Sequence, residues 1–217
     1  MGSWLTFVRK TPCLTLLVVQ LSGVVIYPFL GGESSYAGRT IFASLGILAL
    51  LLVIRAVRAT PWFSWFSGLV FVPALLLLAA SIVTGEPVLI PISAAFEAVL
   101  YGYAGIALLA YMLHDSRVTT DELFAIPTVF TLFAWAFAFL FVVVQALDPG
   151  AFGPEERTWM ELLYVSFTTL SSVGLSDIGP ATGHARSVIM LEQVVGIFYI
   201  AMVVTRLVSL RAERRSV

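Results

Sequence analysis

Six long apolar runs constrain this 217-residue chain more than any other feature. Five of them could each cross the hydrocarbon core of a bilayer unaided, which takes about 20 residues, and the sixth is interrupted only by Glu192, Gln193 and Arg206. The runs are residues 13–30, 40–57, 66–83, 94–113, 124–147 and 187–210. Hydrophobic residues make up 59% of the sequence and charged residues only 12%, which is too little polar surface for a soluble domain. We therefore expect an all-α integral membrane protein with six transmembrane helices.

The basic residues predict how the chain is oriented. Nine of the twelve Lys and Arg residues fall near one face if both termini are cytoplasmic, as the positive-inside tendency requires. The first run follows Arg9 and Lys10, as in a signal peptide, but no small-residue cleavage site comes directly after it. We therefore expect this run to be retained as a helix. No basic patch lies outside the membrane flanks, which argues against a nucleic-acid partner.

The outer connection between the fifth and sixth runs, residues 148–186, is the most informative segment. Within it, residues 158–170 are apolar and helix-prone, but they would form a helix of only roughly 20 Å, too short to cross a bilayer. A strip rich in Ser and Gly follows at residues 171–180. Irregular backbone survives at membrane depth only where it is buried in protein or lines an aqueous path. The pattern therefore predicts a re-entrant pore helix and loop.

The composition of this loop suits the coordination of cations. A ring of backbone carbonyls, supplied by several copies of one short loop, can replace the hydration shell of an ion. Such a loop needs Gly for unusual backbone angles and a Ser or Thr hydroxyl for a further oxygen ring. The preceding half-helix directs its negative C-terminal end at the cavity, which favours cations. The residues that meet these demands are Thr168, Thr169, Ser171, Ser172, Val173 and Gly174.

Residues 164–180, YVSFTTLSSVGLSDIGP, resemble the pore loop of the potassium channel superfamily, whose filter usually reads TVGYGD. Residues 185–210 are similar to the inner helices of small bacterial six-helix channels without a ligand-binding domain. Arg186 and Gly196 stand where family members often carry a basic residue and a hinge glycine. The resemblance implies a homotetrameric channel of the plasma membrane, here a bacterial inner membrane. It further implies contact with membrane lipids, passage of K⁺ or other monovalent cations, and no cofactor.

The same resemblance assigns the filter positions. They are Ser172, Val173, Gly174, Leu175 and Ser176, followed by Asp177 at the outer mouth. The first three match the family's Thr, Val and Gly, and their carbonyls would bind K⁺ or Na⁺. Leu175 replaces the usual Tyr and Ser176 the second Gly, and a left-handed non-glycine residue costs about 1–2 kcal/mol. We therefore expect the loop near Ser176 to be strained or folded differently, with weakened selectivity for K⁺ over Na⁺.

The sixth run would form the inner helix. Gly196 is expected either to bend this helix or to allow close packing, and the two readings are equally open. The expected lining is Ile197, Ile200, Val204 and Val208. This stripe follows helical spacing and could gate by dewetting, although it could also face lipid or another helix. Glu192 lies one turn before Gly196, and we expect it to make a buried structural hydrogen bond to the pore-helix region.

Two parts of the chain are expected to differ in role. Residues 1–122 would form a peripheral four-helix membrane domain, and residues 123–217 the pore domain. The fourth run occupies the place of a voltage-sensing helix, but residues 88–113 contain no Lys or Arg. Moving a gating charge requires several positive residues in the field, so voltage sensing by this helix is not expected. Its one acidic residue, Glu97, lies near the outer end and is expected to reach toward the membrane surface.

Three alternatives stay open on the sequence. The first two are a non-selective cation channel and a non-conducting channel relative whose altered filter has closed the pore. A distant third is an intramembrane hydrolase, because Gly174 to Asp177 superficially matches a serine nucleophile turn. That chemistry needs a histidine base beside Ser176, whereas His114 and His184 are expected at the cytoplasmic and outer ends of helices. Cys13 is the only cysteine, so no cysteine-based metal cluster is expected.

Overall fold

The computed structural model describes residues 11–30, 48, 51–52, 64–84, 86, 88–114 and 120–213. Every regular element in these ranges is helical, which confirms the expected all-α class for the described part of the chain. The elements are α2 (Pro12–Ile26), η1 (Tyr27–Leu30), α4 (Ser64–Thr84), α5 (Leu89–His114), α6 (Thr120–Leu147), α7 (Trp159–Leu170) and α8 (Gly183–Glu213). The expected second span, residues 40–57, lies outside the described residues except for positions 48, 51 and 52.

Four of the described helical segments are long and apolar enough to cross a membrane. They are Pro12–Phe29, Leu89–Leu113, Leu123–Leu147 and Gly183–Val208. Helix α7 is only 12 residues long, roughly 18 Å at the rise of an α-helix, so it cannot cross by itself. The long helices therefore form the body of the protein, and the short α7 is held between two of them.

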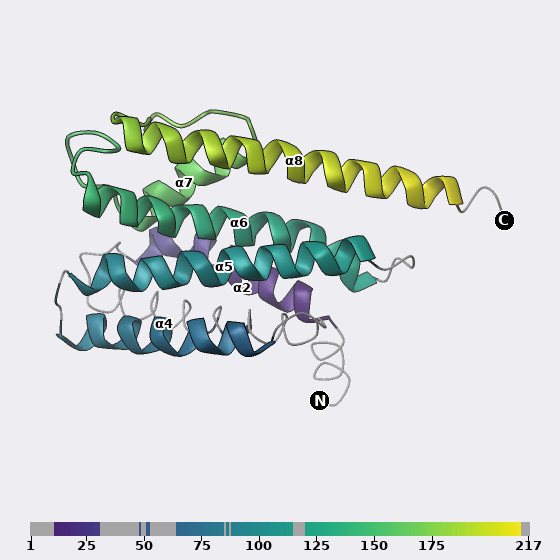
Figure 1. Cartoon of the computed structure of the whole chain (residues 1–217), viewed down its shortest axis with the longest axis horizontal. Helices are drawn as coiled ribbons and strands as arrows, with labels where there is room; N and C mark the ends of the chain where they lie inside the picture. The colour runs from purple at the N-terminus through teal and green to yellow at the C-terminus, as the bar shows by residue number, and fades with distance from the viewer. Residues whose placement is uncertain are drawn as a thin grey trace.

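Helix α6 is the central element of the described fold. In Figure 1, α4, α5, α6 and α8 lie side by side in that order, with α7 between α6 and α8. Helix α2 packs against α6, as α5 does. Residues on several faces of α6 are buried, so this helix connects the N-terminal helices to the α7–α8 unit.

Aromatic side chains fill the junction between α5, α6 and α7. The Trp135 ring of α6 lies 5.0 Å from Trp159 at the start of α7 and 5.4 Å from Tyr101 of α5. Helix α5 approaches α6 closely at Gly105, where an added Cβ would lie 2.7 Å from the Phe133 ring. Glu97 of α5 is only 4% exposed, so the expectation that it reaches the membrane surface is wrong for this chain.

Polar side chains join α2 to α6 within this apolar interior. The Thr128 hydroxyl lies 3.1 Å from the Cys13 carbonyl, and the Thr131 hydroxyl donates to Gln20 Oε1 at 2.9 Å. Gln20 is fully buried, and its Nε2 has no hydrogen-bond partner among the described residues. Helix α2 is therefore held against α6 by side-chain hydrogen bonds as well as by apolar contact.

Candidate functional site

Helix α7 begins at a capping box. The Thr158 hydroxyl accepts the Glu161 N–H at 3.3 Å, and Glu161 Oε2 accepts the Thr158 N–H at 2.8 Å, so two free donors of the helix start are satisfied. The hydrogen bond from the Thr158 N–H is the main reason why the pKa of the Glu161 carboxyl is lowered. Just before the cap, the Gln145 side chain of α6 bonds both backbone groups of Arg157. The start of α7 is thereby tied to the end of α6.

The polar residues at the end of α7 point their hydroxyls back at the helix. Thr168 donates to the Val165 carbonyl at 2.9 Å, and Ser171 donates to the Phe167 carbonyl at 2.7 Å. Ser171 is the C-cap, and its own N–H bonds the Phe167 carbonyl at 3.2 Å. These hydroxyls therefore bond carbonyls of α7 itself, beside the loop that follows.

The loop after α7 is anchored by three successive backbone N–H groups. The Ser172 N–H donates to the Thr169 carbonyl at 2.9 Å, and those of Val173 and Gly174 both donate to the Thr168 carbonyl at 3.0 Å. In a planar trans peptide, the carbonyl that precedes an N–H points the opposite way. The carbonyls of Ser171, Ser172 and Val173 therefore point away from the end of α7. Residues 172–175 are also exposed in the single chain.

The left-handed backbone in this loop does not lie where the sequence led us to expect it. Ser172 has φ 60° and Gly174 has φ 66°, and Ser172 is the one non-glycine residue with positive φ in the described part of the chain. Of the two readings expected near Ser176, strain or a different fold, left-handed strain at Ser176 itself is wrong, and the loop is folded differently. The Ser176 hydroxyl instead accepts the Ile178 N–H at 3.1 Å, which closes a local turn. The unusual conformation occurs where the chain leaves α7.

Tyr164 of α7 contacts the loop, and nothing in the sequence analysis predicted this contact. Its hydroxyl donates to the Leu175 carbonyl at 3.0 Å, so this carbonyl points toward α7. The Leu175 side chain is 73% exposed and does not anchor the loop itself. The available signal was that Tyr164 is the only tyrosine in the short helix that precedes the loop.

The far end of the loop lies beside the end of α6 and the start of α8. Asp177 is exposed, and the following Ile178 is buried. The Asp148 carboxyl after α6 receives a hydrogen bond from Thr182 and lies 3.1 Å from His184 Nδ1, and both contacts lower the pKa of Asp148. The His184 ring is thus paired with Asp148, a geometry that does not provide Ser176 with a base.

Gly196 of α8 lies directly against the end of α7. A Cβ added there would be 2.1 Å from the Leu170 carbonyl oxygen and 2.9 Å from its carbonyl carbon. Glu192, one turn earlier, is fully buried and hydrogen-bonds Ser166 of α7. The Ser166 hydroxyl also lies 2.9 Å from the Ala134 carbonyl of α6. These contacts bring three helices together behind the loop.

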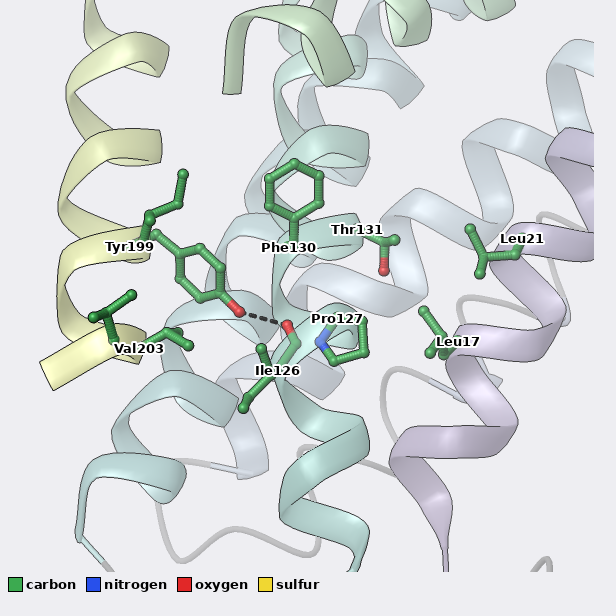
Figure 2. Close-up of a pocket in the computed structure, with 10 residues that line it drawn as sticks. Leu17, Leu21, Ile126, Pro127, Phe130, Thr131, Tyr199 and Val203 are labelled. Carbon is green, nitrogen blue, oxygen red and sulfur yellow. Dashed lines mark hydrogen bonds between the residues drawn. The ribbon is translucent and has the colours of Figure 1, made fainter. Parts of the chain in front are cut away.

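The expected lining residues of α8 lie on an exposed side of the helix. Ile197, Ile200, Val204 and Val208 are all exposed in the single chain. Two of them, Ile200 and Val204, also border an apolar pocket of about 360 Å³ between α8, α6 and α2. In Figure 2, the Tyr199 side chain lines this pocket, and its hydroxyl donates to the Ile126 carbonyl next to Pro127. The stripe therefore runs along the edge of the α6 contact.

Comparison with known proteins gives one finding. Residues 126–212 match a family model described as an ion channel. The match covers less than half of the chain and contains most of α6, all of α7, the loop and nearly all of α8. No curated protein and no solved structure matches the chain. The apolar helices and this match indicate a multi-pass membrane protein whose C-terminal part is similar to the ion channel family.

Proposed function

We propose that the chain is one subunit of a homotetrameric cation channel of the plasma membrane, with both termini in the cytoplasm and K⁺ as the favoured ion. Residues 123–217 would form the pore domain and residues 1–122 a peripheral domain without gating arginines. The similarity of residues 126–212 to ion channels supports the general class. The subunit number follows from the resemblance to potassium channels and from the closed symmetry that most homo-oligomers adopt.

One observation carries the proposal: consecutive backbone carbonyls of the loop point away from α7. The N–H groups of Ser172, Val173 and Gly174 are all used on the α7 side, so the carbonyls that precede them are free to face a shared axis. Oxygen rings of this kind replace the water around a cation. One chain supplies one oxygen to each ring, which is why the site would be complete only when copies assemble.

Two further features favour a cation over an anion. The C-terminal end of α7, with its partial negative charge, lies at the start of the loop. Asp177 is exposed just beyond the filter positions and would add negative charge to the outer mouth. The exposed apolar side of α8 would line the inner part of the pathway and contact neighbouring subunits and lipid.

Flux measurements with a matched pair of glycine variants test this proposal. Purified protein in liposomes should pass K⁺ down a gradient, and the oligomer should have the mass of four chains. Gly174→Ala should reduce the flux strongly, because φ 66° is strained for any residue with a Cβ even though the site has space. Gly179→Ala is the control, because Gly179 has equal space and no positive φ. Wild-type protein without flux, or equal flux from both variants, would refute the proposal.

A further inference from the structure

We propose that Tyr164 sets the ion selectivity of the loop by fixing the orientation of the Leu175–Ser176 peptide, which is opposite to that of the preceding peptides. In this arrangement the Leu175 carbonyl is turned toward α7 and withheld from the ions. The inference rests on the proposed channel function and deepens it by naming a specificity-determining residue. Tyr164 touches no ion in this scheme and acts through the backbone of Leu175.

The direction of successive peptides carries the argument. Three N–H groups, those of residues 172, 173 and 174, point toward α7, so the carbonyls of residues 171, 172 and 173 point away from it. At Leu175 the relation is inverted, because the carbonyl itself is bonded to the Tyr164 hydroxyl of α7 at 3.0 Å. The N–H of Ser176, in the same peptide, must then point away from α7. The peptide direction therefore reverses between residues 174 and 176.

The spacing of the anchors shows that the loop runs back along α7. The N–H groups of Val173 and Gly174 are held by the Thr168 carbonyl, and the Leu175 carbonyl is held by Tyr164, one helical turn nearer the start of α7. The Leu175 side chain is largely exposed, and the Ser176 hydroxyl is used by the Ile178 N–H. Within the described residues, Tyr164 is therefore the hydrogen-bond donor that fixes this peptide.

The reversal has a direct consequence for cations. On a shared axis, the carbonyls of Ser172 and Val173 would give oxygen rings. The Leu175–Ser176 peptide, two positions beyond the Val173 carbonyl, would instead present the N–H donor of Ser176. Donors repel cations, and preference between K⁺ and Na⁺ depends on the number and field of the coordinating carbonyls. A filter with its outer peptide reversed would therefore keep the inner sites and discriminate weakly between the two ions.

Removing the Tyr164 hydroxyl tests this assignment. We expect Tyr164→Phe to raise the ratio of K⁺ to Na⁺ permeability, measured from reversal potentials under mixed gradients. A neutral hydrogen bond ordinarily shifts such a balance by roughly fivefold, so an increase of about two- to fivefold is expected. Tyr101→Phe is the matched control, because it deletes one buried hydroxyl of α5 that has no partner among the described residues. It should keep the wild-type ratio.

The outcomes separate this inference from the proposed function. Wild-type protein that carries no flux would refute the channel itself. A conducting Tyr164→Phe channel with an unchanged or lower permeability ratio would refute only the role of Tyr164.

A second measurement covers the case in which Tyr164→Phe does not conduct. The carbonyls of Leu175 and Val173 can be observed by NMR in wild-type protein with ¹³C-carbonyl Leu and Val and ¹⁵N Ser and Gly. The Leu175 signal is assigned by its loss in Leu175→Ile. Exchange of K⁺ for Na⁺ should leave this signal in place and move the Val173 carbonyl signal. Movement of the Leu175 signal together with that of Val173 would overturn the proposal.

Discussion

Replacing Gly196 with alanine should destabilise the contact between α7 and α8. The new methyl carbon would lie 2.1 Å from the Leu170 carbonyl oxygen and 3.1 Å from the Leu170 Cα. Carbon-to-oxygen contacts usually begin near 3.3 Å, so the two helices would have to separate by roughly 1 Å. The obstacle is backbone, which cannot rotate away as a side chain can. The hydrogen bond between Glu192 and Ser166, one turn away, would be stretched by the same movement.

Two opposing effects decide the size of the change. Overpacking a filled contact costs about 1–3 kcal/mol, and a backbone neighbour places Gly196→Ala toward the upper end. Alanine recovers about 1 kcal/mol of helix propensity relative to glycine. We therefore expect a net loss of about 1–2 kcal/mol in each subunit. For a chain of this size, that corresponds to a fall in melting temperature of roughly 2–8 °C.

The assay is thermal unfolding of the purified protein, in which size-exclusion chromatography monitors the loss of the native peak. Liposome flux is measured alongside it. Gly23→Ala in α2 is the control, because its Cβ would meet nothing within 4 Å. That variant should melt at the wild-type temperature or slightly above it. If Gly196→Ala is as stable as Gly23→Ala, the close contact with Leu170 is not present in the native protein. Reduced flux with unchanged stability would instead support the hinge reading of Gly196.

Three further predictions concern buried or capped polar groups. Glu192→Gln should melt near the wild-type temperature because the amide oxygen can still accept from the Ser166 hydroxyl. Glu192→Ala should instead cost about 1–3 kcal/mol, and equal losses would contradict this hydrogen bond. The hydrogen bond from Thr158 lowers the folded-state pKa of Glu161. The contribution of this hydrogen bond to protein stability is therefore present above the unfolded pKa of about 4.3 and is lost as the pH falls through the folded pKa. Melting curves of Glu161→Gln should therefore show less acid destabilisation than wild type, and identical pH profiles would argue against the cap. Gln20→Leu should be neutral or mildly stabilising. The substitution removes a buried amide nitrogen that has no partner among the described residues. The hydrogen bond from Thr131 that it also removes should matter little, because hydrogen bonds between membrane helices average only about 0.6 kcal/mol. A loss well above that value would show that the amide is paired in the membrane.

Much of the helical organisation could be predicted from the sequence. The runs at 66–83, 94–113 and 124–147 lie inside α4, α5 and α6, and the short element at 158–170 corresponds to α7, Trp159–Leu170. These features depend on composition and on residues close together in the chain. Apolar length determines which segments suit a bilayer, and the capping box around Thr158 determines where α7 begins.

The details of the site needed the tertiary structure. Sequence alone left Gly196 open between hinge and packing, left the loop near Ser176 open between strain and a different fold, and gave no role to Tyr164. The structure places Gly196 against Leu170, the left-handed residue at Ser172, and the Tyr164 hydroxyl on the Leu175 carbonyl. Each of these depends on how the end of α7, the loop and α8 approach one another in space. The residue pattern determined that this chain has apolar helices and a short polar loop, but peptide directions and contacts under 4 Å are decided only when separate segments pack.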